Sequence, residues 1–151
     1  MNLFHDIRLL VVHALDQMVA ADQLPQGLSY ANVTVEPPRD PLHGDMATNA
    51  AMVLAKPSGQ SPRAIAEALA PLLRADPRII GADAAGPGFL NLLLCTSVWQ
   101  ELVGQVLENG AAYGRSNLGN NRSVNVEFVS ANPTGPLHVG HMRGAVFGDA
   151  L

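Results

Sequence analysis

The segment 126–141 constrains the fold of this chain more than any other part of the sequence. Apolar and polar residues alternate over 124–128, a polar turn rich in proline and glycine follows, and His138 and His141 stand at its end. This order predicts a strand, a tight turn and a helix that begins at the histidines, which is the first unit of an open α/β sheet. Ten residues follow His141, too few to complete such a sheet, so we expect the front end of a longer enzyme.

The composition is typical of a globular chain with a sizeable core. Of the 151 residues, 48% are apolar and 15% are charged, which argues against disorder and suits one domain plus the beginning of another. The formal net charge of −4 gives no general attraction for nucleic acid. Any contact with RNA must therefore be local, made by individual arginines or by stacking.

The single cysteine and the N-terminal segment bear on localisation. Cys95 excludes an internal disulfide, and its place after the apolar run 92–94 predicts a buried structural thiol rather than a nucleophile. The first residues lack the pattern of a signal peptide, and no run approaches the roughly 20 apolar residues that span a membrane. We expect a cytoplasmic monomer with no membrane partner.

Hydrophobic periodicity and turn residues predict an α+β unit, helices on a small antiparallel sheet, over residues 1–112. The expected elements are a helix from Leu3 to about Ala21, a strand over 32–36, a helix over 46–56 capped by Asp45 and broken by Pro57 and Gly59, a helix from Ser61 and Pro62 to Leu73, strands over 79–85 and 89–94 around the turn 86–88, and a helix over 97–109 with Val98, Leu102, Val106 and Leu107 facing inward. A polar linker over 113–122 then leads to 123–151, the start of a Rossmann-type α/β catalytic domain.

The two histidines suit a phosphate ligand. A helix start presents unpaired N–H groups and the positive end of the helix dipole, and residues three apart lie on one side of its first turn. His138 and His141 could both donate hydrogen bonds there, and Gly140 would let a planar ligand approach the backbone.

Two other readings of the histidines are weaker. A metal site would need a third ligand, and none is near because Cys95 belongs to the core, so no protein-bound metal is expected. Histidines that merely decorate a helix start would not require the stiff turn before them.

Three polar residues should lie at the carboxyl edge of the expected strand. Glu127 could pair with a guanidinium or an amine, and Ser130 and Asn132 could bind the head group of an amino acid. The prolines and glycine of the turn would reduce the entropy lost in holding these groups in place.

The run 126–141 resembles the segment of bacterial arginyl-tRNA synthetases that carries the class I His-Ile-Gly-His motif, here His-Val-Gly-His over 138–141. The match continues through 143–145. Upstream, the runs 44–51, 55–56, 62–67 and 86–92 resemble the appended N-terminal domain of those enzymes. The resemblance covers nearly the whole chain in order.

The resemblance implies ATP-dependent activation of arginine, with Mg²⁺ accompanying the ATP, and transfer of arginine to tRNA(Arg). It implies that His138, Gly140 and His141 bind ATP and that the two histidines assist adenylation. It implies that Glu127, Ser130, Asn132 and His138 contact arginine. The implied motif region comprises Ala131, Asn132, Pro133, Thr134, Gly135, Pro136, Leu137, His138, Val139, Gly140 and His141.

The appended domain of this family contacts the D-loop of tRNA, and Phe89 and Asn91 match the positions that read a base there. An aromatic ring can stack on a base, and an amide can bond a base edge. Phe89 could instead be an ordinary core residue. Because Asn91 lies two positions along the same expected strand, both point to one face, and a polar partner favours a surface.

The chain departs from the family pattern mainly at its end. The rest of the nucleotide-binding domain, the second ATP loop and the anticodon-binding domain are absent, so we expect the chain alone to be inactive. Two alternatives remain open: a non-catalytic module that binds tRNA or another RNA, and a nucleotidyltransferase of the related His-x-Gly-His superfamily. The latter usually opens with the motif's strand, whereas here a domain precedes it.

Overall fold

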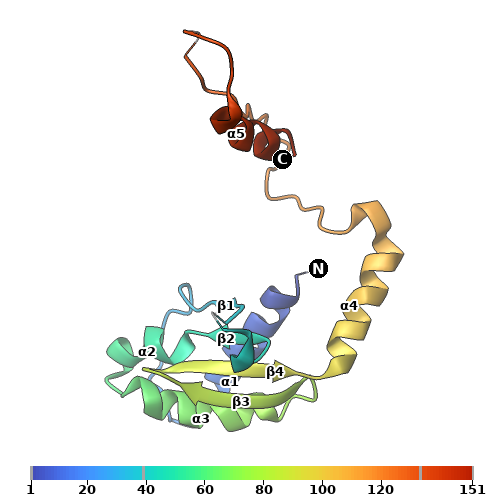
Figure 1. The fold of residues 1–151 in the computed structure, drawn as a ribbon. Helices are drawn as coiled ribbons and strands as arrows, with labels where there is room; N and C mark the ends of the chain where they lie inside the picture. The colour runs from blue at the N-terminus through green and yellow to red at the C-terminus, as the bar shows by residue number, and fades with distance from the viewer. Residues whose placement is uncertain (1, 39, 133, 151) are drawn as a thin grey trace. The chain divides into compact units, whose positions relative to one another are not determined.

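The computed structural model describes residues 2–38, 40–132 and 134–150, and its internal contacts divide the chain into two units, Met1–Gly114 and Arg115–Leu151. The elements of the first unit are α1 (Leu3–Ala20), β1 (Val35–Glu36), the 3₁₀ turn η1 (Pro41–His43), β2 (Met46–Thr48), α2 (Ala50–Ser58), α3 (Pro62–Arg74), β3 (Ile79–Ala85), β4 (Phe89–Leu94), α4 (Thr96–Asn109) and η2 (Gly110–Ala112) (Figure 1). The second unit contains α5 (Val139–Asp149).

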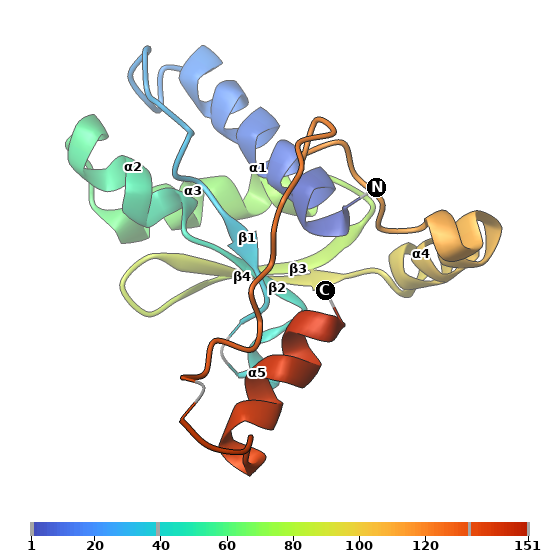
Figure 2. The ribbon, with the colours of Figure 1, turned by 90° about the horizontal axis from the view of Figure 1, so that it is seen from above.

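The first unit is a layer of helices on one antiparallel sheet, as the sequence predicts. The strand order is β1-β2-β4-β3, and each neighbouring pair is antiparallel. In Figure 1 α3 lies below the strands, and in the view from above it lies farther from the viewer than the sheet (Figure 2), while α1 packs against α3 and β1. The helices therefore cover one face of the sheet.

Side-chain alternation along β4 separates the two faces of the sheet. Leu90, Leu92 and Leu94 are buried against the helices, whereas Phe89 and Leu93 on the other face are 40% and 46% exposed. A strand places successive side chains on opposite faces, so Asn91 shares the open face with Phe89. This confirms the expectation that the two residues share a face and that Phe89 is not a core residue.

The core is built from helical stripes that face the sheet. The buried positions of α1 include Ile7, Val11 and Leu15, and α3 buries Ile65 and Leu69 with the same four-residue spacing. Burial of each such side chain stabilises the fold by about 1.5–3 kcal/mol. The predicted start of α3 is also confirmed, because the Ser61 side chain accepts the Ala64 N–H at 3.1 Å.

The prediction of a helix over 46–56 is wrong at its beginning. Residues Met46–Thr48 form β2, paired with β4, and the Asp45 carboxylate accepts the Leu94 N–H at 2.8 Å instead of capping a helix. Pairing buries Met46 and Thr48 completely, and this tertiary gain outweighs the helix propensity of the alanine-rich run. Pro57 does not break α2 as predicted, because it lies inside the last turn. The helix ends at Ser58, with Gly59 as its C-cap residue.

The predicted strand over 32–36 is reduced to two residues because side chains bind the backbone before it. The Arg8 guanidinium donates to the carbonyl oxygens of Val33 at 2.7 Å and Tyr30 at 2.9 Å. Asn49 accepts the Thr34 N–H at 2.8 Å. These bonds take the place of a strand ladder.

The inward face predicted for α4 is only partly correct. Val98 is buried, Leu102 is partly buried, and Val106 and Leu107 are exposed, Leu107 by 76%. Figure 1 shows α4 running on from the end of β4 beyond the sheet, so only its first turn can reach the core. Cys95, at the start of this helix, is partly rather than fully buried.

In the second unit α5 begins where the histidines predict, but the expected strand over 124–128 is not formed. A strand needs a neighbour, and no segment in the described part of the chain pairs with this one. The segment still packs on α5, because a methyl group at Gly148 would collide with the Phe128 side chain. No helix among the described residues has the length and apolar character to cross a membrane.

Candidate nucleotide-binding motif and nucleic-acid interface

The two histidines cap the first turn of α5 reciprocally. His138 is the N-cap residue, and its Nδ1 accepts the Gly140 N–H at 3.1 Å. The His141 ring reaches back, and its Nδ1 accepts the His138 N–H at 3.2 Å. The ring centroids lie 3.9 Å apart with the planes tilted by 32°. The structure thus brings both imidazoles together on one side of the helix start.

This capping fixes which imidazole atoms can meet a ligand. A neutral imidazole that accepts at Nδ1 carries its proton on Nε2, so each ring has an N–H donor that the capping bonds leave available. The backbone amides are less available than the sequence suggests. Those of Gly140 and His141 are bonded to His138, through its ring and its carbonyl respectively.

Gly140 has a steric role inside this cap. A methyl group in its place would lie 2.9 Å from Cε1 of the His138 ring, which is closer than van der Waals contact. The glycine therefore lets the His138 imidazole fold over the first turn.

Among the described residues, the other predicted residues of the second unit make no hydrogen bond to the histidines. Glu127, Ser130 and Asn132 are exposed, and among the described residues their side chains make no hydrogen bond. Pro133 lies outside the described residues. Thr134, Gly135, Pro136, Leu137 and Val139 are exposed, and Ala131 is partly buried.

The open face of the sheet holds a cavity of about 400 Å³ that both predicted RNA-binding residues line. Phe89 and Asn91 come from β4. Further lining residues, none of them a candidate site residue from the sequence, include Glu36, Pro37, Pro38, His43 and Ala47. They were missed because strand pairing, which brings β1 and β2 beside β4, is not readable from local pattern.

A cluster of hydrogen bonds holds the wall of this cavity in place. Asn49 donates through Nδ2 to the Asn32 carbonyl at 3.1 Å and accepts the Thr34 N–H. The Thr48 hydroxyl donates to the Thr34 carbonyl at 2.8 Å. These bonds fix the segment that leads into β1. Residues of the run 44–51 therefore hold one wall of the cavity in place.

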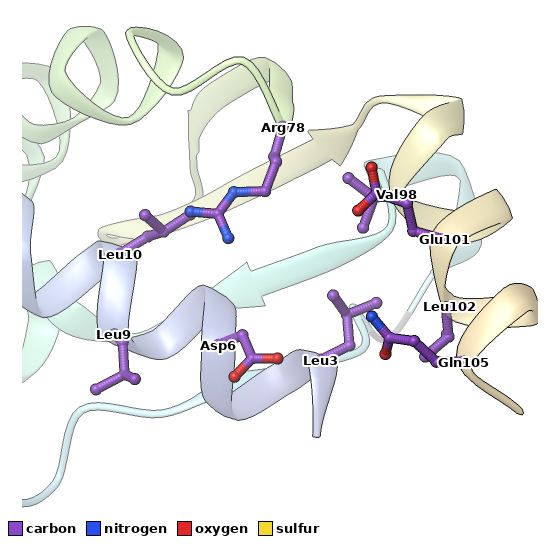
Figure 3. A pocket seen from close by; sticks show the side chains of 9 residues that line it. All are labelled: Leu3, Asp6, Leu9, Leu10, Arg78, Val98, Glu101, Leu102 and Gln105. Carbon is purple, nitrogen blue, oxygen red and sulfur yellow. The ribbon is translucent and has the colours of Figure 1, made fainter. Parts of the chain in front are cut away.

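A second cavity, of about 460 Å³, lies between α1 and α4 (Figure 3). Its walls include Leu3 and Leu10 of α1 and Val98 of α4, with Arg78 at one end. The Arg78 guanidinium is already bonded twice to Asp76, at 3.0 Å each, and these bonds hold the pKa of that carboxyl below its usual value. The lining combines apolar side chains with Asp6, Glu101 and Gln105, and it contains none of the predicted site residues.

Comparison with known proteins identifies the family of this chain. Residues 5–94 match the sequence model of a family described as Arginyl tRNA synthetase N terminal domain. The whole chain is 69% identical to a protein of Ruegeria pomeroyi and 68% identical to one of Paracoccus denitrificans, both called arginine–tRNA ligase. It spans about a quarter of their length, 26% of each.

A solved structure, Thermus thermophilus arginyl-tRNA synthetase, is similar over 99% of this chain and 22% of its own length. The TM-score is 0.55 and the sequence identity is 29%. Since the family match covers more than half of the sequence, the chain belongs to the arginyl-tRNA synthetase N-terminal domain family.

Proposed function

We propose that this chain is the N-terminal part of an arginine–tRNA ligase, which activates arginine with ATP and transfers it to tRNA(Arg). The identity to two proteins of that name over all 151 residues supports the proposal. In this assignment residues 1–112 contact tRNA, 113–122 are a linker, and 123–151 begin the Rossmann-type catalytic domain.

The tRNA contact is supported by one observation above the others: Phe89 and Asn91 line the same cavity on an open sheet face. A half-exposed aromatic ring beside an amide offers a stacking surface and a hydrogen-bonding group to an unpaired base. Such a stack contributes about 1–3 kcal/mol per base. With a net charge of −4, the chain would rely on such local contacts.

The adenylation step would use the start of α5. The Nε2–H groups of His138 and His141 would donate to phosphate oxygens of ATP, which would enter with Mg²⁺, and Gly140 would lie against the nucleotide. Glu127 would pair with the guanidinium of arginine, and Ser130 and Asn132 would contact its head group. These last three residues would gather only when the segment around 124–128 is paired in a sheet.

A non-catalytic RNA-binding module is the second candidate for this chain on its own. The cavity belongs to the unit Met1–Gly114, which contains its own core, whereas the histidines lie in the other unit. We expect the 151 residues alone to bind tRNA and to give no ATP–pyrophosphate exchange.

A chimaera tests the proposed parent activity. Residues 1–151 replace the matching segment of the Ruegeria pomeroyi arginine–tRNA ligase, and charging of tRNA(Arg) with arginine is measured. The chimaera should charge, and Phe89→Ala within it should raise the KM for tRNA roughly tenfold, the equivalent of one lost stack. Leu93→Ala, on the same sheet face but away from the cavity, is the matched control. A folded chimaera that charges no tRNA would overturn the proposal.

A further inference from the structure

A row of four side chains crosses the open face of the sheet. The pairing register sets Glu36 opposite Ala47, Ala47 opposite Asn91, and Asn91 opposite Asp83. Paired residues point to the same face, so the row reads carboxylate, methyl, amide, carboxylate across β1, β2, β4 and β3. Adjacent strands are about 4.8 Å apart, which separates Glu36 from Asn91 by roughly 10 Å with only the Ala47 methyl group between them.

This spacing leaves room for one planar base. The cavity is lined by the first three members of the row and by Phe89, but not by Asp83. A base with its face on Phe89 and its edge over Ala47 has the amide on one side and the Glu36 carboxylate on the other. Asp83 lies beyond Asn91 and is bonded to Arg74 at 3.1 Å.

The chemistry of the carboxylate restricts which base edge can face it. Ionised glutamate only accepts hydrogen bonds, whereas the amide of Asn91 both donates and accepts. A base that presents a carbonyl oxygen to Glu36 places two hydrogen-bond acceptors against each other, and no hydrogen bond forms between them. A base with an exocyclic amine presents a donor, as cytosine N4 does to Glu or Asp.

We propose that Glu36 is a specificity-determining residue that selects a base with an amine at purine C6 or pyrimidine C4, adenine or cytosine, over the bases with an oxygen at that position, hypoxanthine and uracil. The inference rests on the proposed RNA contact at Phe89 and Asn91. Glu36 would add a hydrogen-bond acceptor for the base from β1, whereas Phe89 and Asn91 both lie on β4. No local sequence motif contains all three residues.

The probes are tRNA(Arg) molecules altered at one unpaired D-loop base, chosen as the one whose replacement by an abasic site weakens binding most. That base is made adenine, hypoxanthine, cytosine or uracil. Binding to the 151-residue chain is measured by fluorescence anisotropy. We expect the amino bases to bind roughly tenfold tighter than their oxo counterparts.

Two variants with the same change in charge distinguish a direct hydrogen bond to Glu36 from a general effect of negative charge on this face of the sheet. Glu36→Gln, whose amide can also donate, should reduce the amino-to-oxo ratio to about twofold or less. Asp83→Asn should leave the ratio unchanged, since it removes the same charge from the same face outside the cavity. A wild-type ratio near one, or a ratio that survives in Glu36→Gln, overturns the inference.

The abasic replacements and Phe89→Ala test the RNA contact independently of the role of Glu36. If neither the abasic replacement at any D-loop position nor Phe89→Ala weakens binding, the proposed tRNA contact fails and Glu36 with it. If both weaken binding but Glu36→Gln leaves the ratio intact, the contact stands and only the role of Glu36 is lost.

Discussion

At the residue scale, the capping of α5 shows what a short motif does before any ligand arrives. The two imidazoles of the His-Val-Gly-His segment each accept a backbone N–H through Nδ1. The sequence predicted the helix start and the shared side of the histidines. It did not predict the reciprocal cap, because that depends on the χ angles of two rings and not on their spacing.

The cap predicts the tautomer of both rings. In the neutral form, His138 and His141 should carry the proton on Nε2, because Nδ1 accepts a backbone N–H in each. Imidazole ¹⁵N chemical shifts at alkaline pH should show a non-protonated Nδ1 for both, with exposed His5 of α1 as the reference ring. A protonated Nδ1 on either ring would show that its capping bond is absent in solution.

At the scale of elements, side chains from α1 and α2 determine how far the sheet extends. Asn49, at the N-cap position of α2, bonds the backbone at Asn32 and Thr34 and so holds the entry to β1. The loss of two such bonds at a partly exposed site costs about 1–2 kcal/mol.

The variant Asn49→Ala should therefore lower the free energy of unfolding by about that amount, measured by urea denaturation, and also weaken tRNA binding. Asn91→Ala is the contrast, because Asn91 also lines the cavity but holds no loop. It should weaken tRNA binding with a loss of stability of less than about 0.5 kcal/mol. Equal losses of stability in both variants would refute the positioning role of Asn49.

A second element-level prediction concerns the turn from α3 into β3. Hydrogen bonds from Arg78 lower the pKa of Asp76 in the folded state, so this carboxylate stabilises the fold above its unfolded pKa and loses that effect as the pH falls. Because Arg78 is 43% exposed, the contribution should be only about 0.5 kcal/mol.

Thermal unfolding of Asp76→Asn and of the wild type should differ at neutral pH and converge as the pH falls from about 5 to 2. Asp83→Asn, which alters a more exposed ion pair with Arg74, provides the control. A difference that persists unchanged at pH 2 would mean that the effect of Asp76 is not electrostatic.

The elements that the sequence predicts best are those with local signals. The cap and first-turn proline of α3, the glycine-rich turn between β3 and β4, and the stripe of α1 all form as expected. The run 46–48 fails because its state is decided by pairing with β4, about 45 positions away in the sequence. Glu36 was not a candidate for the same reason.

At the scale of the whole molecule, the two units differ in whether their elements find packing and pairing partners within the same unit. Met1–Gly114 contains a complete layer of helices, a four-stranded sheet and the buried core. In Arg115–Leu151 the segment 124–128 has the alternation of a strand but no partner among the described residues. The predicted strand is therefore not formed here, because a strand exists only when it pairs with a neighbour.

We propose that the open face of the sheet in Met1–Gly114 binds an unpaired base of tRNA. Amide chemical-shift mapping during titration with tRNA(Arg) tests this directly on the 151-residue chain. We predict that the largest changes fall on Glu36, Ala47, Phe89 and Asn91, with small changes on α1 and α3, which cover the other face. Changes centred on the cavity between α1 and α4, or on the helix layer, with β1, β2 and β4 unperturbed, would contradict the account.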